Sequence, residues 1–144
     1  MADESSLPEK YVLDACALIA FLNDEVGAEK VEQLIEQAQS GEVELFASSV
    51  NLYEVYYDAW RHSSPEVADS LLTNLYTMPM TVIETVDRAI IRAAGYFKTT
   101  HRRSVADSFA LALANQLDAH LVSTDHHEFD PVDNSGDAKL FWVR

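Results

Sequence analysis

The chain has 144 residues, 48% of them hydrophobic, which suits one domain with a substantial core and argues against a largely disordered protein. Polar residues interrupt every apolar run, which argues against a membrane span. The N-terminal residues are acidic, which argues against a secretory signal. The single cysteine, Cys16, excludes an internal disulfide and suits the cytoplasm. The formal net charge of −14 disfavours a general nucleic-acid-binding surface, because phosphate binding relies on Lys and Arg.

Short apolar segments alternate with helical patterns along the chain. Apolar or alternating runs predict strands at residues 11–13, 42–46, 81–83, 120–123 and, at an edge of the sheet, 139–143. Apolar spacing and capping residues predict helices at residues 15–22, 25–39, about 48–61, from 64 onward, 87–98 and 104–117. Strands separated by helices are typical of an α/β fold, with a mainly parallel central sheet and helices on both faces in three layers. We expect a single domain over residues 1–144, with residues 1–9 flexible.

Two acidic residues stand at the carboxyl ends of predicted strands. Asp14 directly follows the strand at 11–13, and Asp125 closely follows the strand at 120–123. Open α/β sheets bind ligands in the crevice at this edge. Each residue also has a local interpretation, because Asp is a frequent N-cap, which suits Asp14 before a helix, and a frequent turn residue, which suits Asp125.

Two further acids lie within predicted helices. Glu54 shares one face of its helix with Tyr53 and Tyr57, where a buried and unpaired carboxylate would be costly. The alternative is an exposed position on a solvated face. Asp107 comes three residues after Ser104, a spacing that resembles a capping box, so one residue can serve both as a cap partner and in a site.

The four acids together predict a site for a divalent metal ion: Asp14, Glu54, Asp107 and Asp125. Carboxylates packed together without a cation raise one another's pKa values, and a metal relieves that repulsion. Oxygen-only ligation suits Mg²⁺ or Mn²⁺, whereas zinc favours Cys and His. The adjacent histidines at 126–127 match no zinc motif and are interpreted as surface or loop residues. The residues alone therefore suggest a metal-dependent phosphodiesterase.

Three other side chains near these acids have a local and a functional interpretation. Cys16 lies among small apolar residues, which indicates a buried, inert thiol, since a nucleophile would need a nearby base. The hydroxyls of Ser123 and Thr124 either hold a metal-bound water or a phosphate oxygen, or make local hydrogen bonds in a turn.

The basic residues are unevenly distributed. Half of the ten lie between residues 88 and 103, a segment without any acid, which forms either a strip facing phosphate or a solvated helix face and loop. The remaining acidity suggests a second surface for a basic protein partner. Apolar and aromatic residues at 53–60 and 67–76 would form a self-interface, a groove for such a partner, or core.

Four short segments of the sequence carry a family resemblance: YVLDACALIAFL at 11–22, SSVNLYEV at 48–55, SVADSFALA at 104–112 and LVSTDHHEF at 121–129. With these segments the chain resembles the PIN domain family, specifically the VapC-type toxins of type II toxin-antitoxin pairs. The resemblance assigns the family's acidic positions, in order, to Asp14, Glu54, Asp107 and Asp125, and gives Ser123 an assisting hydroxyl. It implies a Rossmann-like sheet, a homodimer, an inhibiting antitoxin and an Mg²⁺- or Mn²⁺-dependent endoribonuclease that hydrolyses RNA by metal-activated water. Three acids would hold one metal, and Asp125 would complete the site, hold a second metal or position the water.

Other classes fit less well. A phosphatase similar to haloacid dehalogenases would need a second acid two residues after Asp14, where this chain has Cys16. A response-regulator receiver would need a phospho-acceptor Asp after a later strand, where the strand at 81–83 is followed by Glu84. The main alternative is a PIN-like RNA-processing nuclease or protein-binding module without an antitoxin. A small upstream reading frame for a basic-tailed DNA-binding protein would favour the toxin.

Overall fold

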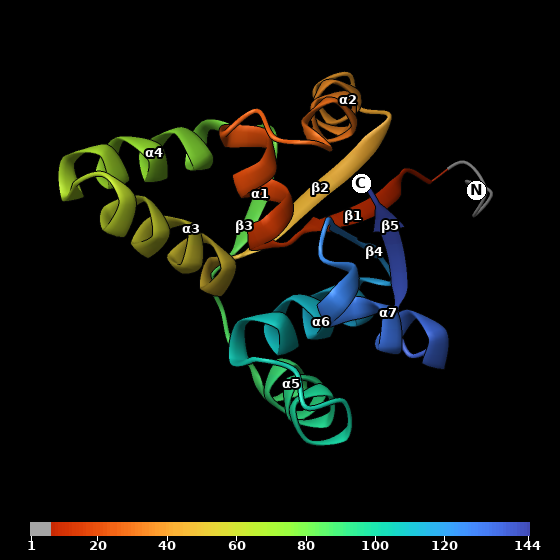
Figure 1. Ribbon diagram of the computed structural model, residues 1–144. Coiled ribbons are helices and arrows are strands. Elements are labelled where there is room, and N and C mark those ends of the chain that lie inside the picture. Colours follow the sequence, from red (N-terminus) through yellow and green to blue (C-terminus); the bar gives the residue numbers. More distant parts are fainter. Residues whose placement is uncertain (1–6) are drawn as a thin grey trace.

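The computed structural model describes residues 7–144 and has a five-stranded sheet at its centre (Figure 1). Every neighbouring pair of strands is parallel, and the strand order is β3-β2-β1-β4-β5. The predicted α/β fold is confirmed. The strands are β1 (Glu9–Leu13), β2 (Val43–Ser48), β3 (Thr81–Ile83), β4 (His120–Ser123) and β5 (Lys139–Trp142).

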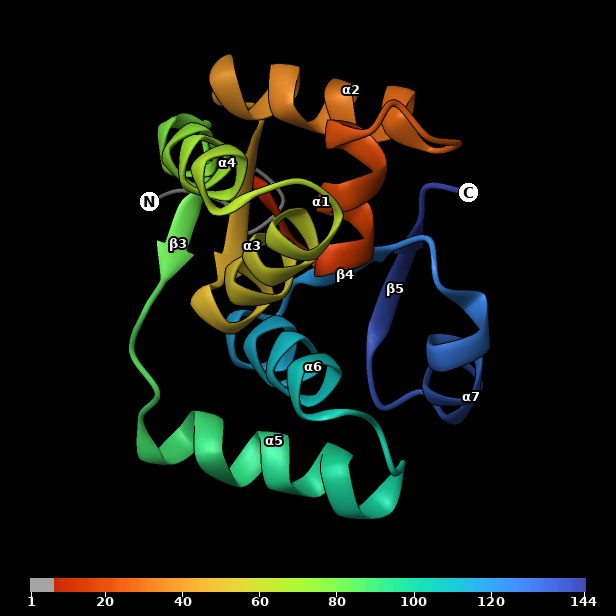
Figure 2. The ribbon, with the colours of Figure 1, turned by 60° about the vertical axis from the view of Figure 1, so that its left-hand side comes forward.

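Helices cover both faces of the sheet. In Figures 1 and 2, α1 to α4 lie on one side of the sheet and α5 to α7 on the other. None of the helices within residues 7–144 combines the length and apolar character that a bilayer crossing requires. The helices are α1 (Ala15–Leu22), α2 (Ala28–Gln39), α3 (Ser49–His62), α4 (Pro65–Thr77), α5 (Arg88–Thr100), α6 (Val105–Leu117) and α7 (His126–Ser135).

The two central strands supply both halves of the core. Val12 of β1 pairs with Leu121 of β4, and both pack against α5, α6 and α7. The next pair, Leu13 and Val122, points to the opposite face and packs with α1, α2 and α3. All four side chains are fully buried, which explains why these short strands are continuous apolar runs rather than alternating patterns.

The first strand and the second helix begin at other residues than the sequence predicts. Strand β1 already begins at Glu9, a residue expected to be flexible, which pairs with Val43; residues 1–6 lie outside the described part. Helix α2 begins at Ala28 rather than at residue 25, because Gly27 adopts a left-handed backbone conformation (φ 103°) that ends any helix there. The same glycine lies so close to the C-terminal strand that a Cβ atom would stand 2.9 Å from the Val143 carbonyl oxygen.

Helix α7 was not predicted at all. Its segment is polar and contains Pro131, whose missing N–H and bulky ring normally break a helix. The helix forms because its capping residue and its buried side chains outweigh that cost: Asp125 caps the N-terminus, and Phe129 and Val132 are fully buried against the core on the α5–α6 side of the sheet.

The topology places a switch point between β1 and β4. From β1 the chain passes through α1 and α2 to β2 on one side, and it later returns through α5 and α6 to β4 on the other side. The carboxyl ends of β1 and β4 are therefore a topological switch point, where open α/β sheets bind ligands. Asp14 and Asp125 follow these two strand ends.

Candidate functional site

Asp14 is buried at the end of β1, with only 2% of its surface exposed. Its Oδ1 accepts a hydrogen bond of 2.7 Å from the Ala17 amide, so the residue also caps α1, as the local interpretation predicted. The pKa of Asp14 is raised to about 7, mainly by burial and also by the charges of Asp107 and Glu54, although hydrogen bonds from the Ser123 hydroxyl and the Ala17 amide lower it. The surroundings of Asp14 therefore disfavour the charged form of its carboxyl group.

Glu54 lies on α3, half-buried, and is oriented by Asn51. The Asn51 Nδ2 donates to Glu54 Oε1 at 3.0 Å and to the Ala106 carbonyl oxygen at 3.3 Å. Burial raises the pKa of Glu54, and the hydrogen bond from Asn51 partly offsets that rise. Glu54 is therefore neither fully solvated nor unpaired.

Asn51 is the residue of this site that the sequence analysis missed. It is 1% exposed and connects α3 with the start of α6, so it fixes the helix that carries Glu54 relative to the helix that carries Asp107. Both partners are acceptors, so the amide nitrogen must face them, and Oδ1 is left as a buried acceptor without a partner among the described residues. An Asn one helical turn before Glu54 was the available signal, but its bond to Ala106 depends on tertiary contact.

Replacing Asn51 by Ala should weaken divalent-metal binding by about tenfold or more, because groups that orient metal ligands typically contribute that much. The free energy of unfolding should fall by about 1–3 kcal/mol, because the Ala106 carbonyl loses a buried donor. Calorimetric titration with Mn²⁺ and urea unfolding measure the two effects. Asn74→Ala, at an exposed position of α4, is the matched control; equal Mn²⁺ affinities for the two variants would show that Asn51 does not orient the site.

Asp107 lies in the first turn of α6, whose N-cap is Ser104. The Asp107 amide donates to Ser104 Oγ at 3.1 Å, which is one half of the capping arrangement predicted from the sequence. Burial raises the pKa of Asp107 to about 6, and the charges of Glu54, Glu128 and Asp125 add to the rise, while Ser104 lowers it. The Asp107 side chain therefore experiences the charges of two of the predicted site acids.

Asp125 caps α7 beyond the end of β4. Its Oδ1 accepts from the Glu128 amide at 3.1 Å, and its own amide donates to Ser123 Oγ at 3.0 Å. The Ser123 hydroxyl is thus both a local turn acceptor and a contact of Asp14 that lowers the Asp14 pKa. Ser123 connects the two strand-end acids.

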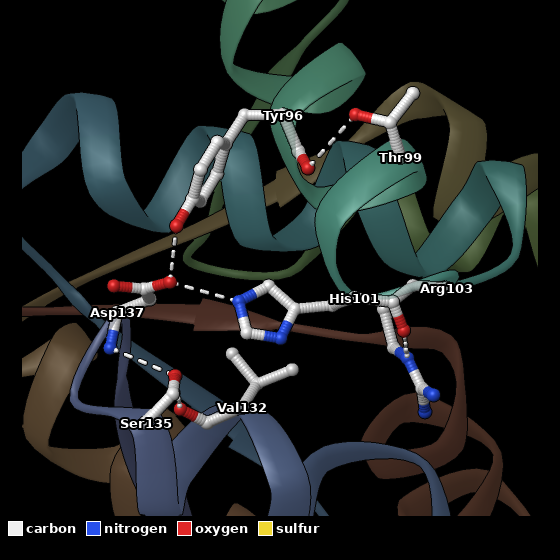
Figure 3. Close-up of polar contacts among 7 residues, drawn as sticks. All are labelled: Tyr96, Thr99, His101, Arg103, Val132, Ser135 and Asp137. Atoms are coloured by element: carbon white, nitrogen blue, oxygen red, sulfur yellow. Dashed lines mark hydrogen bonds and ion pairs between the residues drawn. The ribbon is translucent and has the colours of Figure 1, made fainter.

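A polar network holds the starts of α6 and α7 together. Arg103 Nη1 pairs with Glu128 Oε2 at 3.0 Å and also donates to the Glu128 carbonyl oxygen. Figure 3 shows the other part, where Asp137 lies between Tyr96 and His101, with His101 Nε2 2.8 Å from Asp137 Oδ2. The Arg103 contacts fix the loop before α6 against the start of α7, and the Asp137 contacts join the end of α5 to the segment after α7. Arg103 is occupied by Glu128 rather than free for phosphate.

The pKa of the Cys16 thiol indicates that the four acids lie in one region of the structure. Burial, together with the charges of the four acids, raises the pKa of this thiol to about 12; the acids are Asp14, Asp125, Asp107 and Glu54. The side chain is partly exposed rather than buried as predicted, but the high pKa keeps it protonated and unreactive at neutral pH, as expected of an inert thiol.

The donor set fits Mg²⁺ or Mn²⁺ without forming a closed cage. Within residues 7–144, no three His, Cys, Asp or Glu side chains stand in a ready-made chelating arrangement. Mg²⁺ commonly binds through one or two carboxylates and keeps several waters, which suits acids that influence one another without touching. The buried Asp14 carboxylate supplies the strain that such a cation relieves.

The histidines after Asp125 are exposed, as predicted. His126 Nδ1 lies 2.9 Å from Asp130 Oδ1, its Nε2 lies 2.9 Å from the Arg144 carbonyl oxygen, and its ring stacks on Trp142. Both of its nitrogens are therefore engaged in holding the C-terminal strand against α7, which leaves neither for a metal.

The sequence matches the PIN domain family over residues 11–134, a segment that contains all four acids. The chain is a PIN domain. No curated protein sequence matches this PIN domain.

Solved structures share the fold at low sequence identity. The DNA-bound VapBC complex from Salmonella typhimurium matches with a TM-score of 0.72 at 15% identity, covering 94% of this PIN domain and 99% of that chain. VapBC-1 from nontypeable Haemophilus influenzae matches with a TM-score of 0.67 at 20% identity, covering 92% and 96%. VapC20 from Mycobacterium tuberculosis, described as a sarcin-ricin loop cleaving toxin, matches with a TM-score of 0.64 at 11% identity, covering 85% and 94%.

Proposed function

We propose that this PIN domain is an Mg²⁺- or Mn²⁺-dependent endoribonuclease and the toxin of a type II toxin-antitoxin pair. One observation carries the proposal: Asp14 is buried at the switch point of the sheet, and its pKa is raised by burial and by two further acids, Asp107 and Glu54. Capping of α1 accounts for a carboxyl group at this position but not for two further acids that raise its pKa, whereas a site for a divalent cation accounts for both. The similarity to a toxin described as cleaving the sarcin-ricin loop favours RNA as the substrate.

The catalytic residues would act as a shared carboxylate site. Asp14, Glu54 and Asp107 would hold the metal, and Asp125 would complete the site or orient the attacking water. When bound, the metal would lower the pKa of water and neutralise charge that develops on the phosphate. Asn51 would keep the Glu54 carboxylate facing the site, through the bond to Oε1.

The proposed partners are an antitoxin and a second copy of the chain. A cleft between α1, α3 and α4 has apolar walls from Ile19, Val55 and Leu71, and acidic rim residues, Glu25 and Asp58. Such a cleft, on a chain with a net charge of −14, suits a basic amphipathic segment of an antitoxin in the cytoplasm. Several of the similar solved structures are toxin-antitoxin complexes. Co-expression with the upstream reading frame, followed by purification of a stable complex, tests this part.

The activity test is incubation of the purified protein with a mixed RNA pool and Mg²⁺ or Mn²⁺. Cleavage should require the metal, and EDTA should stop it. An active EDTA-treated sample would contradict the metal-dependent mechanism. A folded protein that cuts no RNA with any divalent metal would instead favour a PIN domain with a binding role.

Cleavage products should carry 5′-phosphate and 3′-hydroxyl ends. Water is the nucleophile in the proposed mechanism, so the 2′-hydroxyl of the substrate takes no part in the attack. Ligation of adaptors that accept only one kind of end distinguishes the products. Products with a 2′,3′-cyclic phosphate would rule out this route.

A further inference from the structure

An open groove beside Glu54 is not explained by the metal site. It runs between α3 and the start of α6, and its lining residues are Val50, Tyr53, Glu54, Tyr57, Arg61, Ser104, Val105 and Ala106. Asn51 bonds to two of these residues, Glu54 and Ala106, from beneath, so the groove is held in shape by the same side chain that orients the site. The groove therefore shares Glu54 with the proposed catalytic centre.

Three side chains of this groove form a row along one face of α3. Tyr53, Tyr57 and Arg61 are spaced four residues apart, which places them above one another on the helix. The tyrosine rings pack edge to face with centroids 5.1 Å apart, and the Arg61 guanidinium lies 5.2 Å from the Tyr57 centroid. Tyr53 is 63% exposed and Tyr57 37% exposed, so large aromatic surfaces face solvent next to a cation.

The composition of the row fits a nucleic acid better than an apolar peptide. Exposed aromatic rings stack on nucleobases, and a guanidinium binds phosphate or stacks on a base. Arg61 is one of only ten basic residues in this acidic chain. The start of α6, with Ser104 as its cap, adds the positive end of a helix dipole to the same groove.

We propose that Tyr53, Tyr57 and Arg61 form a subsite for single-stranded RNA beside the scissile phosphodiester, with the tyrosines stacking on a base and Arg61 contacting a phosphate. The inference rests on the proposed nuclease function and specifies its substrate, because a base must be unpaired to enter the groove. A paired base offers no free face for stacking on a side chain.

The test measures binding separately from cutting. In the Asp14→Asn background with Mg²⁺, affinity is measured by fluorescence anisotropy for a short labelled single-stranded RNA and for its abasic counterpart. Tyr53→Ala and Tyr57→Ala should each weaken RNA binding by about tenfold, because a base–aromatic stack contributes that much, and should leave abasic binding nearly unchanged. Tyr53→Phe should retain affinity. Tyr76→Ala, at an exposed tyrosine of α4, is the matched control.

Arg61 is tested by its salt dependence. Arg61→Gln should reduce the slope of log affinity against log salt concentration by about 0.7, the value for one phosphate contact on a single strand. Arg61→Lys should keep the slope. An unchanged slope in Arg61→Gln would remove the phosphate contact from the proposal.

Cleavage by the wild-type protein separates this inference from the proposed function. If the wild-type protein cuts RNA but Tyr53→Ala and Tyr57→Ala bind RNA as well as Tyr76→Ala does, the subsite is wrong and the nuclease stands. If light scattering gives those variants a lower molar mass than the wild-type protein while their RNA affinity is unchanged, the row is a protein interface and the subsite is wrong. If the wild-type protein cuts no RNA, the proposed function fails, and selective loss of RNA binding in the tyrosine variants would still support the subsite.

Discussion

Asp14→Asn should abolish RNA cleavage, with a loss of about a thousandfold or more, while the protein stays folded. Activation of water and neutralisation of charge by a metal contribute several kcal/mol to a reaction of this type, and about 1.4 kcal/mol corresponds to a factor of ten in rate. Asn keeps a side-chain oxygen that can accept from the Ala17 amide, and it is as good an N-cap as Asp. The substitution therefore removes a charge without removing the cap of α1.

The measurement is single-turnover cleavage of RNA with Mg²⁺, together with a thermal melt of the same sample. Asp24→Asn is the control, because Asp24 is exposed after α1 in a left-handed conformation (φ 53°) that Asn also adopts. That control should cleave at the wild-type rate. Comparable cleavage by folded Asp14→Asn would remove Asp14 from the site.

The contribution of the Asp14 carboxyl group to the stability of the metal-free protein should fall as the pH rises from about 4 to about 7. The pKa of Asp14 is about 7 in the folded chain, against 3.8 as its ordinary value. Below about pH 4 the group is protonated in both states and costs nothing. Between the two values the unfolded chain releases the proton and the folded chain retains it, so the free energy of unfolding falls. Above about pH 7 the loss is complete and amounts to roughly 4 kcal/mol from this one carboxyl group.

Urea unfolding in EDTA across this pH range, for the wild-type protein and Asp14→Asn, isolates the effect. The difference between them should be small near pH 4 and should grow in favour of the variant up to about pH 7. Mg²⁺ at pH 8 should stabilise the wild-type protein more than the variant, because ligand binding to the folded state adds stability. If the difference in free energy of unfolding between the two proteins does not change with pH, the pKa of Asp14 is not raised in the folded chain.

Local patterns in the sequence were enough to predict most of the fold. The strands at residues 81–83 and 120–123 and helix α1 have the predicted bounds, because short apolar runs and capping residues determine them without help from distant contacts. Both features of Asp14, its place at a strand end and its role as a helix cap, were predicted from the neighbouring residues alone. Helix α7 was missed because its burial against the core, rather than its polar composition, stabilises it.

The sequence predicts candidate members of the site but not its geometry. It places two acids at strand ends and two within helices, and the fold brings their charges close enough to influence the Cys16 thiol together. It does not reveal that the side chains lack a chelating arrangement, nor that Asn51 bridges α3 and α6. Both features depend on how α3 and α6, which are far apart in the sequence, pack against each other.

The central position of β1 has a consequence for the synthesis of this protein. Strand β1 is the first to leave the ribosome, but it lies between β2 and β4, and β4 is made only after α6. Long-range parallel pairing of this kind forms late in folding. Until β4 and α7 have emerged, Asp14 has no neighbour across the switch point, so a nascent chain would carry Asp14, Glu54 and Asp107 without Asp125, and the proposed site would stay incomplete during synthesis.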